Sequence, residues 1–250
     1  MEEKKFELTD ETVKCGEHIL HRIKALKNFG HIAKGDLGGY VEKEENLSQE
    51  YECWVYGNAK VYGDAYVSDF SSISSNAKIF DNAMVYDHAV ITDFSIISDN
   101  AKVYGNARIH DHAVISGNSQ VYNRSIVSGD AIILGNAKVY GGAKVYGDAR
   151  VREQVEIYGN AKVYGNTQIF GNTEICGNAE VSDIGDYMVF RNSWSSGRYF
   201  TWTKSNDMWR VGCFYGTGEK LIKKAYIDSK LSGKMYEKYV NFVKELNTNV

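Results

Sequence analysis

Between Val55 and Val181 an aliphatic residue, always Val or Ile, recurs at every sixth position. A small residue follows four places after each of them, from Ala59 to Ala179, and Val155 is the only one larger than Thr. A period of six fits neither the 3.6 residues of a helical turn nor the alternation of an ordinary strand. The hexad itself is therefore the structural unit, and the pattern predicts a solenoid of short strands.

The hexads approach the consensus Val-Tyr-Gly-Asn-Ala-Lys. The aliphatic residue and the small residue two places before it share a parity on a strand, so both point inward. Gly-Asn or Gly-Asp falls at a corner, where positive φ is cheap for Gly and tolerable for Asn and Asp. Three strands and three corners make a triangular coil, so each residue stacks on the one three hexads later at about 4.8 Å. The span holds about seven such coils.

These hexads resemble the hexapeptide-repeat family, and the resemblance implies a left-handed parallel β-helix. The stretch from Gly35 to Gly63, GDLGGYVEKEENLSQEYECWVYGNAKVYG, resembles the leader of a group of these proteins common in phages and prophages. The phrase Val211–Thr217 resembles a small C-terminal module of similar phage proteins. The expected fold is thus mainly β, with the β-helix between an N-terminal β cap and a C-terminal α+β module.

The chain is expected to divide into three parts: a cap over 1–52, the β-helix over 53–183 and a module over 184–250. In the cap, Phe6–Leu8 and His18–Leu26 read as strands. In the module, an antiparallel meander is predicted, followed by two helices that break at Ser232-Gly233. The three strands of that meander are Tyr187–Arg191, Tyr199–Thr203 and Trp209–Phe214.

Composition excludes several classes of protein. A formal net charge of −3 gives no electrostatic reason for general nucleic-acid binding. No run of about 18 apolar residues exists and the first residues do not form a signal peptide, so we expect no membrane contact and a cytoplasmic location. The four cysteines are far apart without a CxxC pair, so we expect neither structural zinc nor disulfides, and no metal site is predicted.

Stacking of the hexads allows the outer surface to be read in columns. One column contains five tyrosines, which either stabilise the ladder by stacking or form a binding surface: Tyr86, Tyr104, Tyr122, Tyr140 and Tyr158. Bulky residues replace the usual corner Asn where Ser replaces the usual Ala, as at Phe94 and Arg124. Together with His110, these irregular positions are the other candidate binding residues.

A second column is apolar on its outer side, which predicts burial in an oligomer. Its candidate interface residues are Ile96, Val114, Ile132 and Leu134. In the family that the chain resembles, the usual assembly is a parallel homotrimer, so the resemblance implies one here.

Hexapeptide acyltransferases use a corner histidine at a trimer interface as general base. Carried over to this chain, that role would fall to His112, with Asp130 three hexads later as the orienting carboxylate and His88 as the second candidate. Acetyl-CoA would then be the acyl donor. Two features count against the activity: no loop interrupts the repeat, and no basic pocket for the coenzyme's phosphates is evident.

Two functional hypotheses follow. The first is a non-enzymatic binding or scaffold protein encoded by a phage or prophage, without a cofactor. It includes a counter-defence factor that sequesters a host protein or a small signalling nucleotide in clefts between subunits. The alternative is a trimeric acyltransferase that uses acetyl-CoA and a corner histidine.

Overall fold

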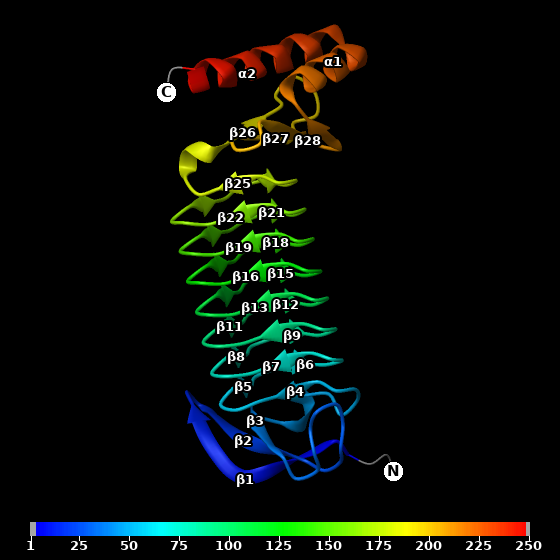
Figure 1. Cartoon of the computed structure of the whole chain (residues 1–250), viewed down its shortest axis with the longest axis vertical. Coiled ribbons are helices and arrows are strands. Elements are labelled where there is room, and N and C mark those ends of the chain that lie inside the picture. The colour runs from blue at the N-terminus through cyan, green and yellow to red at the C-terminus, as the bar shows by residue number, and fades with distance from the viewer. Residues whose placement is uncertain (1–3, 249–250) are drawn as a thin grey trace.

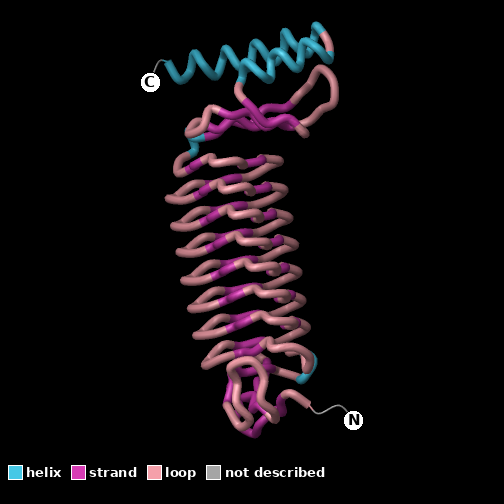
Figure 2. The backbone as a smooth tube through the Cα atoms, turned by 45° about the vertical axis from the view of Figure 1, so that its right-hand side comes forward, coloured by secondary structure: helices cyan, strands magenta, loops and turns pink. Residues whose placement is uncertain are grey.

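The computed structural model describes residues 4–248. The chain forms a tall column of stacked triangular coils, with the N-terminus at one end and the C-terminus at the other (Figure 1). Two-residue strands alternate with tight corners along the whole column (Figure 2). Strands β4 to β25 therefore form a parallel β-helix of between seven and eight coils, as the hexad pattern predicts. It is left-handed, as the family resemblance implies.

The strands of the coils line up in three parallel sheets, one for each face of the triangle. The first face contains β5 (Lys60–Val61), β8 (Lys78–Ile79), β11 (Ile96–Ile97), β14 (Val114–Ile115), β17 (Ile132–Ile133), β20 (Arg150–Val151) and β23 (Gln168–Ile169). The second contains β4 (Trp54–Val55), β7 (Ser72–Ile73), β10 (Val90–Ile91), β13 (Arg108–Ile109), β16 (Ile126–Val127), β19 (Lys144–Val145), β22 (Lys162–Val163) and β25 (Glu180–Val181). The third contains β6 (Tyr66–Val67), β9 (Met84–Val85), β12 (Lys102–Val103), β15 (Gln120–Val121), β18 (Lys138–Val139), β21 (Glu156–Ile157) and β24 (Glu174–Ile175).

The predicted register and side-chain parity are both present. Ile91 pairs with Ile109 one coil later, and Ile97 pairs with Ile115 in the same way. The aliphatic and small positions of the hexads form one continuous buried core along the column. Because every coil repeats the same inward pair, the packing is local and each coil contacts only its neighbours.

Each corner contains a residue with positive φ, usually the Gly of the hexad. Gly105 has a φ of +69°, and a Cβ there would lie 2.7 Å from the backbone N of Asn123 in the next coil. Where Asp takes this place, its carboxylate accepts a hydrogen bond from the backbone N–H one coil later. Asp99 does so from Gly117 at 2.8 Å. A glycine at the corner thus avoids a clash with the next coil, whereas an aspartate there accepts a hydrogen bond from it.

The two ends of the β-helix need different partners. Outward and corner residues donate from the backbone N–H to carbonyl oxygens of the next coil, as Tyr56 does to Ile73 at 2.7 Å. The first coil therefore has carbonyl oxygens with no coil before it to bind them. The last coil has N–H groups with no coil after it to accept from them. The first end of the β-helix therefore requires hydrogen-bond donors and the last end requires acceptors.

The N-terminal cap supplies donors. It contains β1 (Phe6–Cys15), β2 (His18–Ala25), β3 (Leu37–Val41) and the 3-10 helix η1 (Glu44–Asn46). Tyr40 on β3 donates from its N–H to the carbonyl of Ala59 at 2.9 Å. The side-chain amide of Asn46 donates to the carbonyls of Gly63 and Ala65 at 3.0 and 2.9 Å. Of the two strands expected in this cap, β1 is much longer than Phe6–Leu8 because it pairs with β2 along nearly its whole length.

The C-terminal module supplies acceptors. It contains η2 (Ile184–Asp186), β26 (Tyr187–Arg191), β27 (Tyr199–Thr203), β28 (Met208–Val211), β29 (Phe214–Gly216), α1 (Gly218–Asp228) and α2 (Lys230–Thr248). The hydroxyl of Thr201 accepts the N–H of Glu174 at 3.2 Å, and that of Ser205 accepts the N–H of Glu180 at 2.7 Å. The meander thus covers the last coil, and the helices lie on its far side (Figure 1).

Two details of the module differ from the sequence prediction. A turn at Gly212-Cys213 divides the expected strand Trp209–Phe214 into β28 and β29. The helices break at Ser229, whose backbone is extended, and not at Ser232-Gly233. Gly233 lies inside α2, where an added Cβ would fall 2.3 Å from the ring of Tyr226 on α1. The glycine therefore permits close contact between the helices and does not end one. Among residues 4–248, neither α1 nor α2 has the length and apolar surface of a membrane-spanning helix.

Candidate functional site

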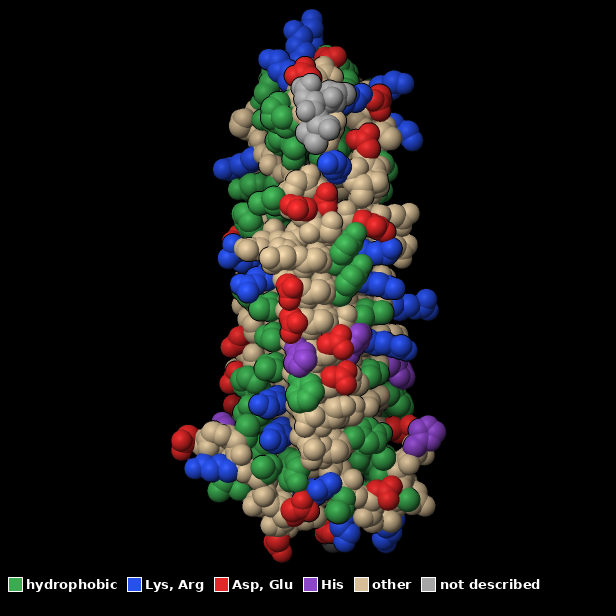
Figure 3. Space-filling view, turned by 60° about the vertical axis from the view of Figure 1, so that its left-hand side comes forward, with side chains coloured by type: hydrophobic (Ala, Val, Ile, Leu, Met, Phe, Trp, Pro, Cys, Tyr) green, Lys and Arg blue, Asp and Glu red, His purple; other side chains and the backbone are tan. Residues whose placement is uncertain are grey.

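The candidate site lies at the corner that joins the second face to the first, midway along the column. His110 directly follows β13 and His112 lies two residues before the start of β14, with Asp111 between the two histidines at a φ of +61°. Histidine and acidic side chains gather at this height of the column (Figure 3). The coils above and below place Phe94 and Asp130 in the same column as His112, as the stacking rule predicts.

His112 lies between an aromatic ring and a carboxylate. Its ring stacks on that of Phe94, with centroids 5.2 Å apart and planes 12° from parallel. Its Nδ1 lies 3.8 Å from Oδ1 of Asp130, which is an ion-pair distance and longer than a hydrogen bond. The His112 side chain is 63% exposed. In a single chain, Phe94 and Asp130 thus orient the ring from two sides, and its other sides are open to solvent.

His110 contacts the carboxylate of Asp111, its neighbour in the sequence. Its Nδ1 lies 3.1 Å from Oδ2 of Asp111. The same oxygen accepts the backbone N–H of Gly129 at 2.9 Å. Asp93, one coil earlier, accepts from the hydroxyl of Thr92 at 2.8 Å and from the N–H of Asp111 at 3.2 Å. These two hydrogen bonds lower the pKa of Asp93, with a smaller contribution from the neighbouring histidines.

Asp93, His110 and Asp111 each offer one ligand atom, and these atoms lie within 4.8 Å of one another. Sequence reasoning did not identify Asp93, although its position three hexads before Asp111 is the signal that would have found it. Both carboxylates already accept backbone N–H groups of the next coil, as Asp81 and Asp99 do at corners without a histidine. The cluster is therefore explained by the corner structure.

His88 has the same aromatic support as His112 without the carboxylate. Its ring stacks on Phe70, with centroids 4.9 Å apart. Within residues 4–248 no ion pair is formed by His88, whereas His112 has Asp130. Arg124 lies exposed in the column of His88, two coils later, at the corner between the third and second faces. His88 and Arg124 are therefore at a different corner from His112.

An apolar column on the first face begins beside His112. Ile96, Val114 and Ile132 are in register in β11, β14 and β17 and are half-buried. Leu134, just after β17, is 37% exposed. The same column has Lys78 before Ile96 and Arg150 after Ile132. The expected apolar strip is present and has a cation at each end.

The five tyrosines stack as predicted, at the corner between the third and second faces. Consecutive ring centroids from Tyr86 to Tyr158 are 4.8 to 4.9 Å apart. The rings are half-buried, and Tyr140 donates from its hydroxyl to Glu156 at 2.9 Å. Arg210 of the module lies 5.7 Å from the ring centre of Tyr158 and covers that end. The stripe and His112 are at different corners, so the structure does not bring them together.

The serines that replace Ala beside bulky corners have a local explanation. Ser71, Ser95 and Ser125 are buried, and each hydroxyl donates to the backbone carbonyl three residues earlier. The hydroxyl therefore stabilises the corner itself, and no serine of this set faces His112 as a nucleophile would.

No protein-family model matches the chain. A segment of 60 residues is 33% identical to the "Uncharacterized acetyltransferase YdcK" of Escherichia coli (strain K12). This segment covers 24% of the chain and 18% of that protein, so the chain matches less than a fifth of the relative's length. The relative, like the fold, is consistent with the acyltransferase hypothesis.

Proposed function

We propose that the protein is a hexapeptide-repeat acyltransferase in which His112 is the general base. The observation that carries the proposal is the arrangement of His112 between Phe94 and Asp130, which orients the imidazole at a corner. The acetyltransferase relative supports the same class of reaction. Together they favour this activity over the non-enzymatic binding role, and the expected phage origin and counter-defence role stay predictions.

In the proposed reaction, Nδ1 of His112 bears the proton and faces Asp130, which leaves Nε2 free to accept one. Nε2 removes the proton of an acceptor hydroxyl or amine while that oxygen or nitrogen attacks the thioester carbonyl of acetyl-CoA. The C–S bond breaks, and the imidazolium returns the proton to the leaving thiolate. The acceptor is acetylated, the coenzyme thiol is released, and His112 is neutral again.

Exclusion of water from His112 would limit hydrolysis of the thioester, and one chain leaves the ring largely exposed. The apolar column that begins at Ile96 lies beside it. A parallel homotrimer would bury this column against a neighbouring subunit and enclose His112 in the cleft between them. Lys78 and Arg150, at the two ends of the column, are the candidate partners for the phosphates of acetyl-CoA.

The test is release of free thiol from acetyl-CoA with a panel of amines and hydroxyl compounds as acceptors. We expect His112→Ala to lower the rate by about 10²–10⁴-fold, the usual contribution of a general base. His88→Ala is the matched control, because His88 has the same aromatic stacking without a carboxylate, and it should leave the rate unchanged.

The binding hypothesis gives the opposite result. A wild-type protein that releases no thiol, and that co-purifies with a nucleotide and not with CoA in native mass spectrometry, would overturn the acyltransferase proposal.

A further inference from the structure

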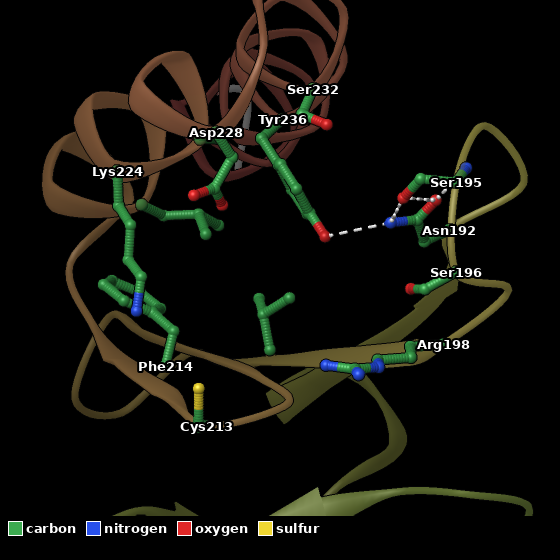
Figure 4. A pocket seen from close by; sticks show the side chains of 13 residues that line it. Asn192, Ser195, Ser196, Arg198, Cys213, Phe214, Lys224, Asp228, Ser232 and Tyr236 are labelled. Carbon is green, nitrogen blue, oxygen red and sulfur yellow. Dashed lines mark hydrogen bonds between the residues drawn. The ribbon is translucent and has the colours of Figure 1, made fainter.

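A cavity of about 260 Å³ lies in the C-terminal module, outside the β-helix and remote from His112. It is formed by α1, the start of α2, the loop after β26 and the turn between β28 and β29 (Figure 4). The same module covers the last coil of the β-helix. The cavity is a separate feature of it, since the groups that cover the last coil lie on the opposite side of the meander.

One wall of the cavity is a fixed polar frame around Asn192, which is 4% exposed. Its Oδ1 accepts the backbone N–H groups of Trp194 and Ser195 at 3.2 and 2.9 Å. Its Nδ2 donates to the hydroxyl oxygens of Ser195 and Tyr236 at 2.9 and 3.3 Å. Every polar atom of the Asn192 side chain is therefore engaged, which holds Tyr236 in one position (Figure 4).

Tyr236 points a hydrogen-bond donor into the cavity. The side chain is 7% exposed and its oxygen already accepts from Asn192, so its own proton is available to another acceptor. Burial raises the pKa of Tyr236, which keeps the hydroxyl protonated. Trp194 packs edge-on against the ring, with centroids 5.0 Å apart. Among residues 4–248 no acceptor is seen for this hydroxyl proton, and a buried, fixed donor of this kind is typical of a ligand site.

Two cations and one carboxylate reach the same cavity. Lys224 extends over the ring of Phe214, with Nζ 5.7 Å from its centre. Arg198 crosses the turn at Gly212, where an added Cβ would lie only 2.9 Å from Nη1. Asp228, on the same helix α1 as Lys224, also projects into the cavity, between Lys224 and Tyr236 (Figure 4). The cations outnumber the carboxylate, and the hydroxyls of Ser196 and Ser232 add further donors.

We propose that this cavity binds a small organic molecule through a carboxylate or phosphate group. The anionic oxygens would accept from Arg198, Lys224 and Tyr236, since these donors surround one volume. The organic part would pack on Phe214 and Leu221, which form the apolar wall. The site is independent of acyl transfer at His112, so either proposal stands without the other.

Cys213 makes the proposal measurable, because this free, exposed thiol lines the cavity. Alkylation by iodoacetate, an anion, is compared with alkylation by neutral iodoacetamide, and peptide mass spectrometry follows each cysteine. Cys15 is the internal reference, as it is partly exposed and far from the cavity. We expect the iodoacetate-to-iodoacetamide rate ratio to be about fivefold higher at Cys213 than at Cys15, below the tenfold or more of strongly focused clefts.

Two variants test whether the cavity's cations cause the higher ratio at Cys213. Lys224→Gln should lower that ratio, whereas Lys223→Gln, which changes an exposed lysine outside the cavity, should not.

Protection identifies the anionic group of the ligand. Inorganic phosphate and acetate are tested as protectants of Cys213 against iodoacetamide. Protection by phosphate alone indicates a phosphate ligand, and protection by acetate alone indicates a carboxylate. Equal ratios at Cys213 and Cys15 with protection by neither anion would overturn the proposal.

Discussion

The ammonium group of Lys5 donates to the backbone carbonyl of Cys53 at 3.0 Å, inside the N-terminal cap. It also donates to the carbonyl of Glu50 at 3.2 Å and contacts the sulfur of Cys53 at the same distance. Lys5 is fully buried, and burial lowers the pKa of its ammonium group. Burial of a cation costs free energy. Here the Lys5 ammonium group donates to carbonyl oxygens at the end of the β-helix where no earlier coil can do so.

Lys5→Met should therefore destabilise the protein although it removes a buried charge. The buried carbonyl of Cys53 and the partly buried carbonyl of Glu50 lose their donor, and an unsatisfied buried group costs about 1–3 kcal/mol. We expect the free energy of unfolding in urea to fall by about that amount. Lys4→Met is the control, because Lys4 forms an exposed pair with Glu44 that is worth about 0–1 kcal/mol. Equal stability of the two variants would contradict this role of Lys5.

Asp130→Asn should reduce acyl transfer less than His112→Ala does. The carboxylate lies 3.8 Å from Nδ1 of His112 and acts by orienting the imidazole, without touching the acceptor. We expect a fall of about tenfold in kcat, against about 10²–10⁴-fold for loss of the base itself. Steady-state kinetics of both variants test the order. A larger loss in Asp130→Asn than in His112→Ala would show that the assigned roles are wrong.

Val114→Glu should dissociate the proposed homotrimer. Val114 is the middle residue of the apolar column, so a carboxylate there would be buried without a partner. Size-exclusion chromatography with light scattering should show a trimer for the wild type and a monomer for the variant. Met84→Glu is the matched control, since Met84 is an outward apolar residue on the third face. A wild-type monomer at micromolar concentration would rule out the homotrimer.

The tyrosine stripe should make the protein less stable in alkali. Burial raises the pKa of Tyr86, Tyr104 and Tyr122 above the ordinary value, which the unfolded chain retains. As pH rises through that ordinary value, the unfolded chain loses phenol protons first, so unfolding becomes more favourable. Urea unfolding between about pH 9 and pH 11 should show a falling free energy of unfolding. The Tyr104→Phe, Tyr122→Phe double variant keeps the stacking and should show a shallower fall; an unchanged slope would argue against the effect.

The sequence alone determined the β-helix, its register and the columns on its surface. The reason is that the contacts in the coils repeat: Ile97 meets Ile115 for the same reason that Ile115 meets Ile133. A period in the sequence is then a period in space. The neighbours of His112 follow from it directly, and the structure adds the distances and the solvent exposure.

Only the tertiary structure decided how the segments at the two ends of the molecule pack together. Lys5 and Cys53 meet across 48 positions, and Asn192 and Tyr236 across 44, with no repeat to indicate either contact. The helix break is a similar case, because Gly233 looks like a helix terminator until the ring of Tyr226 is seen against it. Such contacts depend on how unlike segments pack together, and no local pattern specifies that packing.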